Sequence, residues 1–437
     1  MTDGVQRVDQ LTTVGSGTES PLPLVDISRL TVLHATDKRA QGRMLLLEGE
    51  QLAFGREADA CVRLGLHDNR MSRSHAHLAC REGVWSVRDL GSTHGTFIDG
   101  SGVECAPLRH GAVLRVGSTL LLYEHLRFPL STSLLPETPP LLGPSVGLQR
   151  VRGEIAQIGP ANLPVLVLGE TGVGKELVAR TIHATSKRSG PFVAINCAAL
   201  PSELAERELF GNERGAFTGA DQARKGLFEE AHQGTLLLDE VGELAAPLQA
   251  KLLRAIAEGE IRRVGATAPR KVDVRIVAAT HRELSEPGFR DDLRARLSGW
   301  VLHVPPLRER RADIVPFAER FAGGPVTTAA AEALLLHSWP LNVRELRQAM
   351  ESARVRSGEE IPIGLEHLPP YLARSSTSGA AAAQTPLALR VRARGTPTSS
   401  ELAEAMEYFE GNVSNVAAFF GKERRQVYRW LDNYGLR

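Results

Sequence analysis

The sequence predicts a multidomain protein: a β-sandwich, then a parallel α/β domain with a small helical lid, then an all-α segment at the C-terminus. Three observations predict this order. Short runs of alternating apolar and polar residues fill residues 29–125, continuous apolar runs alternate with helical stretches over 143–372, and amphipathic helical patterns follow from residue 398. At 437 residues the chain is also longer than one hydrophobic core supports.

Composition limits the environment and the partners. Lys and Arg total 52 against 51 for Asp and Glu, so no overall charge drives the chain onto nucleic acid, and any such contact must be local. The four cysteines show no C-x-x-C spacing and suit buried, reduced thiols without metal. No run approaches the roughly 18 apolar residues of a membrane span, and no secretory signal begins the chain. We therefore expect a cytoplasmic protein without a membrane partner.

Three stretches lack helical or strand periodicity and divide the chain. Residues 1–28 are polar and predict a disordered leader, and the Pro-, Ser- and Thr-rich residues 126–142 predict a linker. The Ala-, Ser- and Gly-rich residues 373–397 predict a flexible tether. The resulting domains are 29–125, 143–372 with the lid from about residue 310, and 398–437.

The first domain carries polar loops between its predicted strands. Phe54-Gly55-Arg56, Met71 to His75 and Asp89 to Phe97 occur in that order. This set resembles the forkhead-associated (FHA) phosphopeptide-binding domain over nearly the whole segment. A phosphothreonine brings about two negative charges and three acceptor oxygens, so its reader needs a fixed cation and short donors on rigid loops.

The FHA resemblance implies specific roles. The residues it assigns to the phosphopeptide are Arg56, Ser72, Arg73, Thr93 and His94. His94 stands where the family usually has the Asn that holds the peptide backbone, whereas His75 matches a structural histidine that ties loops together. The alternative is a sandwich kept only as a protein–protein scaffold.

The second domain begins with a glycine-rich loop between an apolar strand and a helix. Its glycines let backbone N–H groups approach phosphate oxygens, and Lys175 neutralises the β- and γ-phosphate charges. The predicted ATP-binding residues are Gly169, Glu170, Thr171, Gly172, Val173, Gly174, Lys175 and Glu176. Further apolar runs at 192–195, 235–238 and 274–279 predict a parallel sheet covered on both faces.

Two adjacent carboxylates, Asp239 and Glu240, end one of these predicted strands. An ATPase places one carboxylate near Mg²⁺ and another where it polarises the attacking water. A helix-capping role is the structural alternative. Downstream of the glycine loop, the pair predicts ATP and Mg²⁺ as cofactors, with Asp239 at the metal.

Further blocks resemble the AAA+ domain of bacterial enhancer-binding activators of sigma-54 RNA polymerase. They comprise residues 169–176, 196–200, 208–220, 234–240, 289–297, 305–310 and 339–346. The family itself carries Glu176 at the end of the phosphate loop. Two positions depart from the pattern: His281 stands where Asn is common, and Leu341 where Gly is common.

The AAA+ resemblance implies a mechanism by position. Glu240 orients the water, Asn196 is the switch that holds Glu240 back, and Thr280 and His281 form the sensor segment. Arg290 and Arg296 are fingers supplied to the neighbouring subunit, and Arg344 is the lid's sensor arginine. Activity then requires self-association, from dimers to a hexameric ring.

A loop rich in glycine connects the chemistry to a partner. It consists of Gly215, Ala216, Phe217, Thr218, Gly219 and Ala220. The glycines permit a hinge, and an exposed Phe between them favours a protein contact over an ordinary surface hairpin. By resemblance the partner is sigma-54 in the RNA polymerase holoenzyme.

The last segment predicts a helix-turn-helix, and it resembles the Fis-type DNA-binding domain. Its predicted DNA contacts are Lys422, Arg424, Arg425, Gln426, Tyr428 and Arg429, although a solvated basic face is the default for such a run. Val427, Trp430 and Leu431 are expected to face the core. The partner is upstream, enhancer-like DNA bound by a dimer.

The combined interpretation is an ATP-hydrolysing transcription activator controlled by phosphothreonine recognition, with a Ser/Thr kinase or its substrate as the regulatory partner. Two alternatives remain. One is an AAA+ remodeller of another class, and the other is an ATPase-impaired DNA-binding regulator or scaffold.

Overall fold

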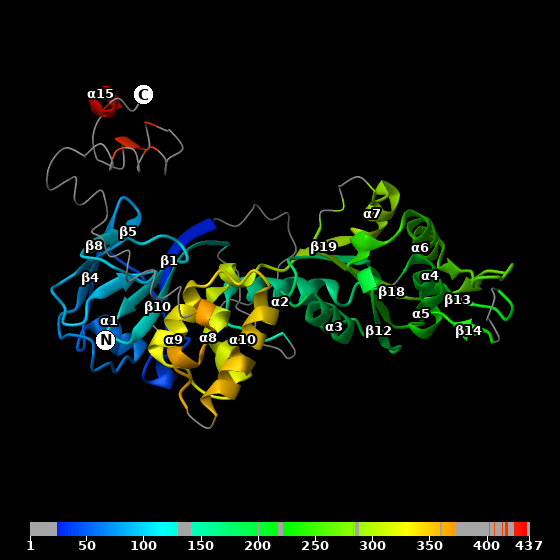
Figure 1. The fold of residues 1–437 in the computed structure, drawn as a ribbon, viewed down its shortest axis with the longest axis horizontal. Coiled ribbons are helices and arrows are strands. Elements are labelled where there is room, and N and C mark those ends of the chain that lie inside the picture. Colours follow the sequence, from blue (N-terminus) through cyan, green and yellow to red (C-terminus); the bar gives the residue numbers. More distant parts are fainter. Residues whose placement is uncertain are drawn as a thin grey trace, which may run out of the picture.

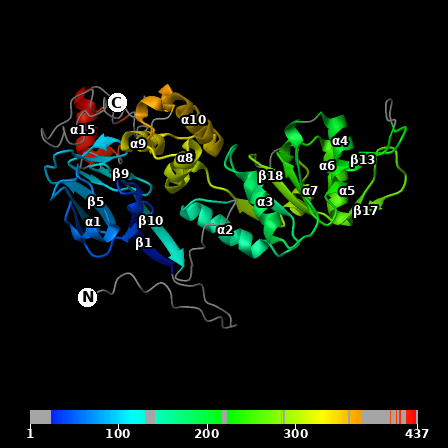
Figure 2. The ribbon, with the colours of Figure 1, turned by 90° about the horizontal axis from the view of Figure 1, so that it is seen from below.

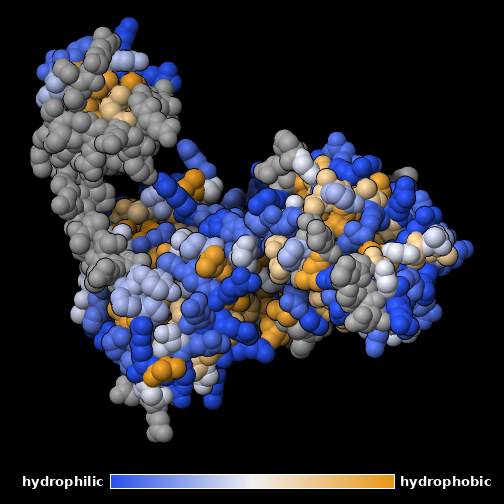
Figure 3. All heavy atoms as spheres, turned by 45° about the vertical axis from the view of Figure 1, so that its right-hand side comes forward, coloured by the Kyte–Doolittle hydropathy of each residue, from blue (hydrophilic) through white to orange (hydrophobic). Residues whose placement is uncertain are grey.

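The computed structural model describes residues 24–129, 141–199, 201–216, 222–282, 284, 288–358, 361–372, 402, 406, 413, 416–417 and 424–434. Figure 1 shows the sandwich at one end, the α/β domain at the other, and the lid helices between them; the perpendicular view in Figure 2 agrees. In Figure 3 the visible surface is mostly hydrophilic, with apolar side chains in separate small groups. None of the described helices is long and apolar enough to cross a bilayer.

The N-terminal domain is the predicted β-sandwich. One sheet has the order β2-β1-β10-β9-β6-β7 and the other β3-β4-β5-β8. The strands are β1 (Leu24–His34), β2 (Met44–Leu46), β3 (Gln51–Phe54), β4 (Ala76–Arg81), β5 (Val84–Asp89), β6 (Thr96–Ile98), β7 (Ser101–Gly102), β8 (Cys105–Pro107), β9 (Val113–Val116) and β10 (Thr119–Pro129), with η1 (Lys38–Ala40) and α1 (Asp59–Leu64) between them. Phe54, Leu78 and Trp85 pack between the sheets.

Both edges of this domain extend beyond the predicted boundaries. Strand β1 begins at Leu24, inside the segment predicted as leader, and β10 continues to Pro129, inside the predicted linker. The two strands pair antiparallel, with Leu24 opposite Pro129. Each strand is extended by hydrogen bonds to the other, and the composition of either segment alone does not show this pairing. Residues 1–23 lie outside the described part of the chain.

The cysteines are free, as predicted, but they are not all buried. Cys61 and Cys197 are buried, Cys80 is half-buried and Cys105 is exposed. Cys105 begins β8, which lies at the edge of its sheet, and an edge strand leaves side chains in contact with solvent.

The α/β domain is built on a five-stranded parallel sheet of order β12-β15-β18-β11-β19. The strands are β11 (Val165–Leu168), β12 (Phe192–Asn196), β15 (Thr235–Asp239), β18 (Arg275–Thr280) and β19 (Trp300–His303). The helices and turns are α2 (Val146–Ile158), α3 (Lys175–Thr185), η2 (Cys197–Ala199), α4 (Ser202–Phe210), α5 (Leu227–Glu230), η3 (Val241–Glu243), α6 (Ala246–Glu258) and α7 (Asp291–Leu297). Two short hairpins pair β13 (Gly211–Asn212) with β14 (Arg224–Lys225) and β16 (Glu260–Ile261) with β17 (Arg270–Lys271).

Both faces of this sheet are buried, which explains the continuous apolar runs. Val165 and Val167 of β11 pack with α2 and α3, whereas Leu166 packs with α4, α6 and α7 on the other face. The register places the carboxyl ends of the strands side by side: Asn196 pairs with Asp239, and Leu168 pairs with Thr280. Parallel α/β sheets bind ligands at this edge.

The lid is a small helical domain, and a helix of the C-terminal segment is described as well. The lid contains η4 (Leu307–Glu309), η5 (Arg311–Asp313), α8 (Ile314–Ala322), α9 (Thr328–Leu336), α10 (Asn342–Ser357) and η6 (Leu365–His367). Near the C-terminus, α15 (Arg424–Tyr434) buries Val427, Trp430 and Leu431 against a small cluster, as predicted for its apolar face.

The sandwich and the lid share one hydrophobic cluster, although the sequence predicted separate modules. Leu33, Val113, Leu120 and Leu122 of the sandwich belong to the same cluster of buried residues as the lid helices. Ion pairs flank it: Arg115 Nε lies 2.9 Å from Glu332 Oε1, and Arg311 Nη1 lies 3.1 Å from Asp99 Oδ1. The sandwich is therefore docked on the lid.

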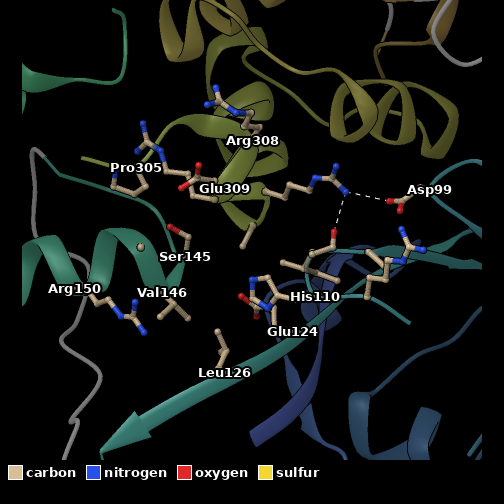
Figure 4. Close-up of a pocket in the computed structure, with 18 residues that line it drawn as sticks. Asp99, His110, Glu124, Leu126, Ser145, Val146, Arg150, Pro305, Arg308 and Glu309 are labelled. Carbon is tan, nitrogen blue, oxygen red and sulfur yellow. Dashed lines mark hydrogen bonds and ion pairs between the residues drawn. The ribbon is translucent and has the colours of Figure 1, made fainter. Parts of the chain in front are cut away.

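A polar cavity of about 510 Å³ lies where the sandwich, the start of α2 and the segment 305–312 meet. Figure 4 shows Arg308, Glu309 and Pro305 on one side of it and His110, Glu124 and Leu126 on the other. Arg311 crosses the gap, since its Nη1 also donates to Gly111 O at 2.8 Å. The cavity is a feature of the interdomain contact and lies apart from the glycine loop.

Candidate active site at the carboxyl edge of the parallel sheet

The glycine loop leaves β11 and opens α3, as its sequence predicts. Gly172 and Gly174 have φ of +79° and +108°, a region that favours glycine. A Cβ on Gly172 would also lie 2.2 Å from Leu341 O, so the lid leaves no room for a side chain there. Glu176, one of the predicted binding residues, pairs its carboxylate with Arg180 one turn along α3.

Lys175 lies over this loop as the first residue of α3 and is only 7% exposed. Its Nζ donates to Gly169 O at 2.9 Å and to Glu170 O at 3.4 Å, and it lies 3.4 Å from Glu240 Oε1. The ammonium group therefore faces both the loop and the carboxylates of β15. A phosphate bound by the loop would meet this cation.

Asp239 ends β15 beside the loop, and its carboxylate accepts a hydrogen bond from Glu240 N at 3.1 Å. Burial raises the pKa of Asp239 and the neighbouring Glu240 raises it further, against the charge of Lys175. Among the described residues no three His, Cys, Asp or Glu side chains cluster as a metal cage. This donor set fits Mg²⁺, which proteins hold through one or two carboxylates plus substrate phosphates.

Glu240 has both carboxylate oxygens engaged. Oε2 lies 2.7 Å from His281 Nδ1 and Oε1 lies 3.4 Å from Lys175 Nζ. Burial alone would raise the pKa of Glu240, but the hydrogen bond from His281 and the charge of Lys175 outweigh it and lower the pKa overall. Glu240 is thus an ionised acceptor, as a residue that orients water requires.

Asn196 does not make the contact that was expected of it. Its side chain is on the same strand edge, but Oδ1 accepts a hydrogen bond from Ala198 N at 2.9 Å, which caps the following turn η2. The structure gives the contact with Glu240 to His281 instead. Thr280, the other sensor residue, is buried, and its Oγ1 accepts from Arg282 N at 3.1 Å.

A network that the sequence did not assign ties the lid to the glycine loop. Arg308 Nη2 and Nη1 lie 2.6 and 2.8 Å from the Glu170 carboxylate, and Asn342 Nδ2 donates to Glu170 Oε2 at 3.1 Å and to Thr171 O at 3.0 Å. The hydrogen bond from Arg308 holds the pKa of Glu170 below its ordinary value despite partial burial. Arg308 and Asn342 lie in the sequence blocks 305–310 and 339–346, which resemble the AAA+ family, and these blocks were the signal that could have indicated the contacts.

The lid arginine and the predicted fingers occupy different surroundings. Arg344 lies on α10 beside Gly172, whose added Cβ would lie 3.1 Å from Arg344 Cβ. Arg290 is exposed at the start of α7 and pairs with Asp292 at 2.7 Å. Arg296 is also exposed, and no residue in the described part of the chain forms a hydrogen bond or ion pair with it.

The apolar residues of α7 face the interior of the domain. Leu293 and Leu297 are fully buried in the core on one face of the parallel sheet. Their burial turns the opposite side of the helix, with Arg296, toward solvent.

The glycine-containing loop at 215–220 is only partly described. Gly215 has φ of +78° and Ala216 lies against Gly265, whereas Phe217, Thr218, Gly219 and Ala220 lie outside the described residues. The base of the loop is clamped: Asn212 Nδ2 donates to Glu213 O and to Gln222 O, both at 3.1 Å.

A buried arginine links this base to the neighbouring hairpin of β16 and β17. Arg263 binds Glu229 through two hydrogen bonds of 2.6 and 2.8 Å, and Glu213 through one of 3.2 Å. Arg270 reaches Glu213 at 3.1 Å from the same hairpin. The two loops at this end of the domain are therefore connected by ion pairs.

In the sandwich, the predicted phosphopeptide loops meet. Arg56 donates to Met71 O and Asn69 O, each at 3.2 Å, and Ser72 Oγ accepts from Thr93 N at 3.2 Å. Arg73 and His94 are exposed on the same loops. The set provides two arginines and short donors within one loop cluster.

His75 is structural, as predicted. It is fully buried, its Nδ1 accepts from Ser72 N at 3.1 Å, and its Nε2 lies 3.1 Å from Gly95 O. Because a carbonyl oxygen only accepts, the proton lies on Nε2. Both ring nitrogens are used in joining the loops, and none is left for a ligand.

The predicted DNA contacts fall mainly on α15. Arg424, Arg425, Tyr428 and Arg429 are exposed on the sides away from Trp430, whereas Gln426 is half-buried one turn before Trp430 on the same face. Lys422 lies outside the described residues. The arrangement gives the helix one basic surface.

Family models match three segments of the chain. The Sigma-54 interaction domain matches residues 141–303, the FHA domain residues 52–117 and the AAA+ ATPase lid domain residues 308–385.

Named regulators match over most of the length. The regulatory protein AtoC of Escherichia coli is 40% identical over 71% of this chain and 71% of its own, and the transcriptional regulatory protein FlbD of Caulobacter vibrioides is 37% identical over 76% and 79%. The anaerobic nitric oxide reductase transcription regulator NorR of Aeromonas hydrophila is 41% identical, but this chain spans only 64% of it. The crystal structure of NtrX from Brucella abortus in complex with ATP is similar at 34% identity with a TM-score of 0.50, over 68% of this chain and 70% of that one.

Proposed function

This chain belongs to the family of transcription regulators that carry a sigma-54 interaction domain, and on that premise we propose that it hydrolyses ATP to remodel sigma-54 RNA polymerase at promoters. The observation that carries the proposal is the convergence of Lys175, Asp239 and Glu240 at the carboxyl edge of the sheet. The chain also carries an AAA+ lid and an FHA domain. Phosphothreonine recognition and DNA binding complete the proposed function.

Each group at the site has a separate task. The amides of the glycine loop and Lys175 bind the phosphates, and Asp239 would hold Mg²⁺, which would supply positive charge to the phosphates. Glu240 accepts a hydrogen bond from the attacking water once Lys175 has turned to the nucleotide. The lid closes this site through Arg308 and Asn342, which already contact the loop.

The arginine fingers imply a shared site. Arg296 is exposed without a partner in the described part of its own chain, and the guanidinium of Arg290 pairs with an exposed neighbour, Asp292. A second copy presenting α7 to the glycine loop would supply the missing positive charge. This supports a ring in which turnover requires assembly.

The loop at residues 215–220 is proposed to transmit the movement caused by ATP hydrolysis to sigma-54. Its base is joined to the β16–β17 hairpin through Arg263, so a shift of that hairpin moves the loop base as well. The sigma-54 contact itself is proposed from the resemblance of the loop. An AAA+ remodeller of another class would share the ATP site but not this loop.

Replacing Thr218 with Ala is expected to leave ATP turnover within about twofold of the parent and to abolish sigma-54-dependent transcription, because the change removes a contact and no catalytic group. Paired ATPase and in vitro open-complex assays measure the two effects. Gln222→Ala, at the base of the same loop, is the matched control and should keep both. Retained transcription by the Thr218 variant contradicts the proposed contact.

Control by phosphothreonine is proposed from the loop cluster of the sandwich. The ion pairs and apolar cluster that dock the sandwich on the lid use other residues, such as Arg115 and Leu120. Peptide binding and docking therefore do not compete for the same side chains. A bound phosphopeptide can alter the ATPase only through the docked sandwich.

Arg56→Ala is expected to weaken phosphothreonine-peptide binding by roughly 10- to 100-fold, because a charge-assisted hydrogen bond contributes about 1.5–3 kcal/mol. Calorimetry on the full chain measures the affinity, and an unphosphorylated peptide gives the baseline. Arg81→Ala, an exposed arginine at the end of β4, changes the same charge and should bind normally. Equal affinity of the parent for both peptides would leave the sandwich as a scaffold.

A further inference from the structure

His281 is held firmly in position beside Glu240. It directly follows β18, and the next residue, Arg282, is fixed twice: its N–H donates to Thr280 Oγ1 at 3.1 Å and its guanidinium lies 2.8 Å from Glu243. Glu243 belongs to η3, which begins immediately after Glu240. The backbone on either side of the His281–Glu240 contact is thus tied together independently of that contact.

The hydrogen bond has a defined direction. Nδ1 of His281 lies 2.7 Å from Glu240 Oε2, and a carboxylate only accepts, so Nδ1 carries the proton. The backbone N–H of His281 also points at the same oxygen, at 3.4 Å. Oε2 is therefore occupied by His281, and the other oxygen is directed away from it.

That other oxygen points to the phosphate-binding side. Oε1 lies 3.4 Å from Lys175 Nζ, and Nζ lies over the carbonyl of Gly169 in the glycine loop. Glu240 itself has φ of +52°, so its backbone places the side chain at an unusual angle to β15. When Lys175 binds a triphosphate instead of Glu240, Oε1 of Glu240 is the oxygen that faces the reacting phosphate.

Asn196 is not available for this task in the observed arrangement. Its Oδ1 is used by Ala198 N at 2.9 Å, and its paired residue across the sheet is Asp239. The only side chains that bind Glu240 within the described residues are Lys175 and His281. Of these two, His281 alone remains once phosphate has engaged the lysine.

We propose that His281 is the positioning residue that aims Glu240 Oε1 at the attacking water, whereas the sequence resemblance named only Asn196 as a partner of Glu240, in the role of a switch that holds it back. The inference rests on the proposed ATPase function. His281 acts through Glu240 and touches neither nucleotide nor water. Its loss should therefore lower kcat and leave nucleotide affinity unchanged.

Two substitutions of nearly equal shape, both with fewer side-chain heavy atoms than histidine, test the hydrogen bond when they are compared with each other. In His281→Asn, Nδ2 is bonded to Cγ as Nδ1 is in histidine, so the donor stays at the same place; in His281→Leu, a methyl group takes that place. We expect kcat of the Leu variant to fall about 10- to 100-fold, the scale at which misplacing a catalytic group acts. The Asn variant should stay within about threefold of the parent.

Three further measurements make the result decisive. Binding of a non-hydrolysable ATP analogue to the full chain should be the same for the parent and both variants. Asn196→Ala should lower kcat by less than His281→Leu does. His232→Ala, which replaces an exposed histidine whose ring accepts a hydrogen bond from Asp273 N, should keep the parental kcat.

The proposal is overturned if His281→Leu keeps kcat within twofold, if its defect lies only in KM, or if Asn196→Ala has the larger effect. Absence of turnover by the parent chain is a different outcome. It would contradict the ATPase function itself, on which this inference depends.

Discussion

Glu240→Gln is expected to bind ATP with parental affinity and to lose turnover by about 10²–10⁴-fold, the range attributed to a positioned general base. The amide keeps the size of the side chain but no longer offers two anionic oxygens to Lys175, His281 and water. Phosphate binding by the glycine loop and Lys175 is unaffected. Steady-state ATPase rates and analogue binding on the same preparation measure the two quantities.

Two further variants serve as controls, one expected to lose nucleotide binding and the other expected to behave as the parent. Lys175→Ala removes the cation that faces the loop, so it should lose nucleotide binding together with turnover. Glu230→Gln, an exposed carboxylate on α5, makes the same chemical change away from the site and should behave as the parent. If Glu240→Gln hydrolysed ATP at the parental rate, a group other than Glu240 would have to orient the attacking water.

Arg296→Ala is expected to lower turnover by about 10³–10⁵-fold, the contribution of an arginine finger, although Arg296 forms no hydrogen bond or ion pair with the described residues of its own chain. The same change at Arg290 should act in the same direction. The physical reason is that the charge stabilises the transition state in a neighbouring subunit. ATPase rates measured over a range of protein concentrations should rise steeply as the ring assembles.

Mixing two inactive proteins gives the sharper test. Lys175→Ala subunits keep their fingers, and Arg296→Ala subunits keep their nucleotide sites, so some interfaces in a mixture combine an intact site with an intact finger. Activity should reappear on mixing. Arg294→Ala, a partly exposed arginine of the same helix paired with Asp291, is the control and should remain active alone. No recovery on mixing, with assembly shown by light scattering, would place the finger elsewhere.

Much of the fold could be predicted because it depends on local patterns. The continuous apolar strands, the glycines that require positive φ, and the acidic pair after β15 are all encoded in short segments. The parallel sheet then places Asp239 beside the glycine loop, since the carboxyl ends of parallel strands share one edge. The nucleotide site was predictable for this reason.

The partner of Glu240 was not predictable from spacing. Asn196 ends β12 and His281 follows β18 at the same edge, and which one reaches Glu240 depends on side-chain directions at the ends of these two strands. In the structure the turn η2 uses the Asn196 oxygen itself, whereas Arg282 and Glu243 hold His281 toward the carboxylate. The first contact is local, but the second joins residues far apart in the sequence.

The sequence by itself determined the β-sandwich, the α/β domain with its lid, the phosphate loop and the carboxylate pair, because periodicity and glycine geometry act over a few neighbouring residues. The tertiary structure alone decided that the sandwich packs on the lid through one shared cluster, that Arg308 and Asn342 join the lid to the loop, and that His281 binds Glu240. Such pairings depend on the packing of whole elements, which brings together side chains whose separation along the chain carries no local signal.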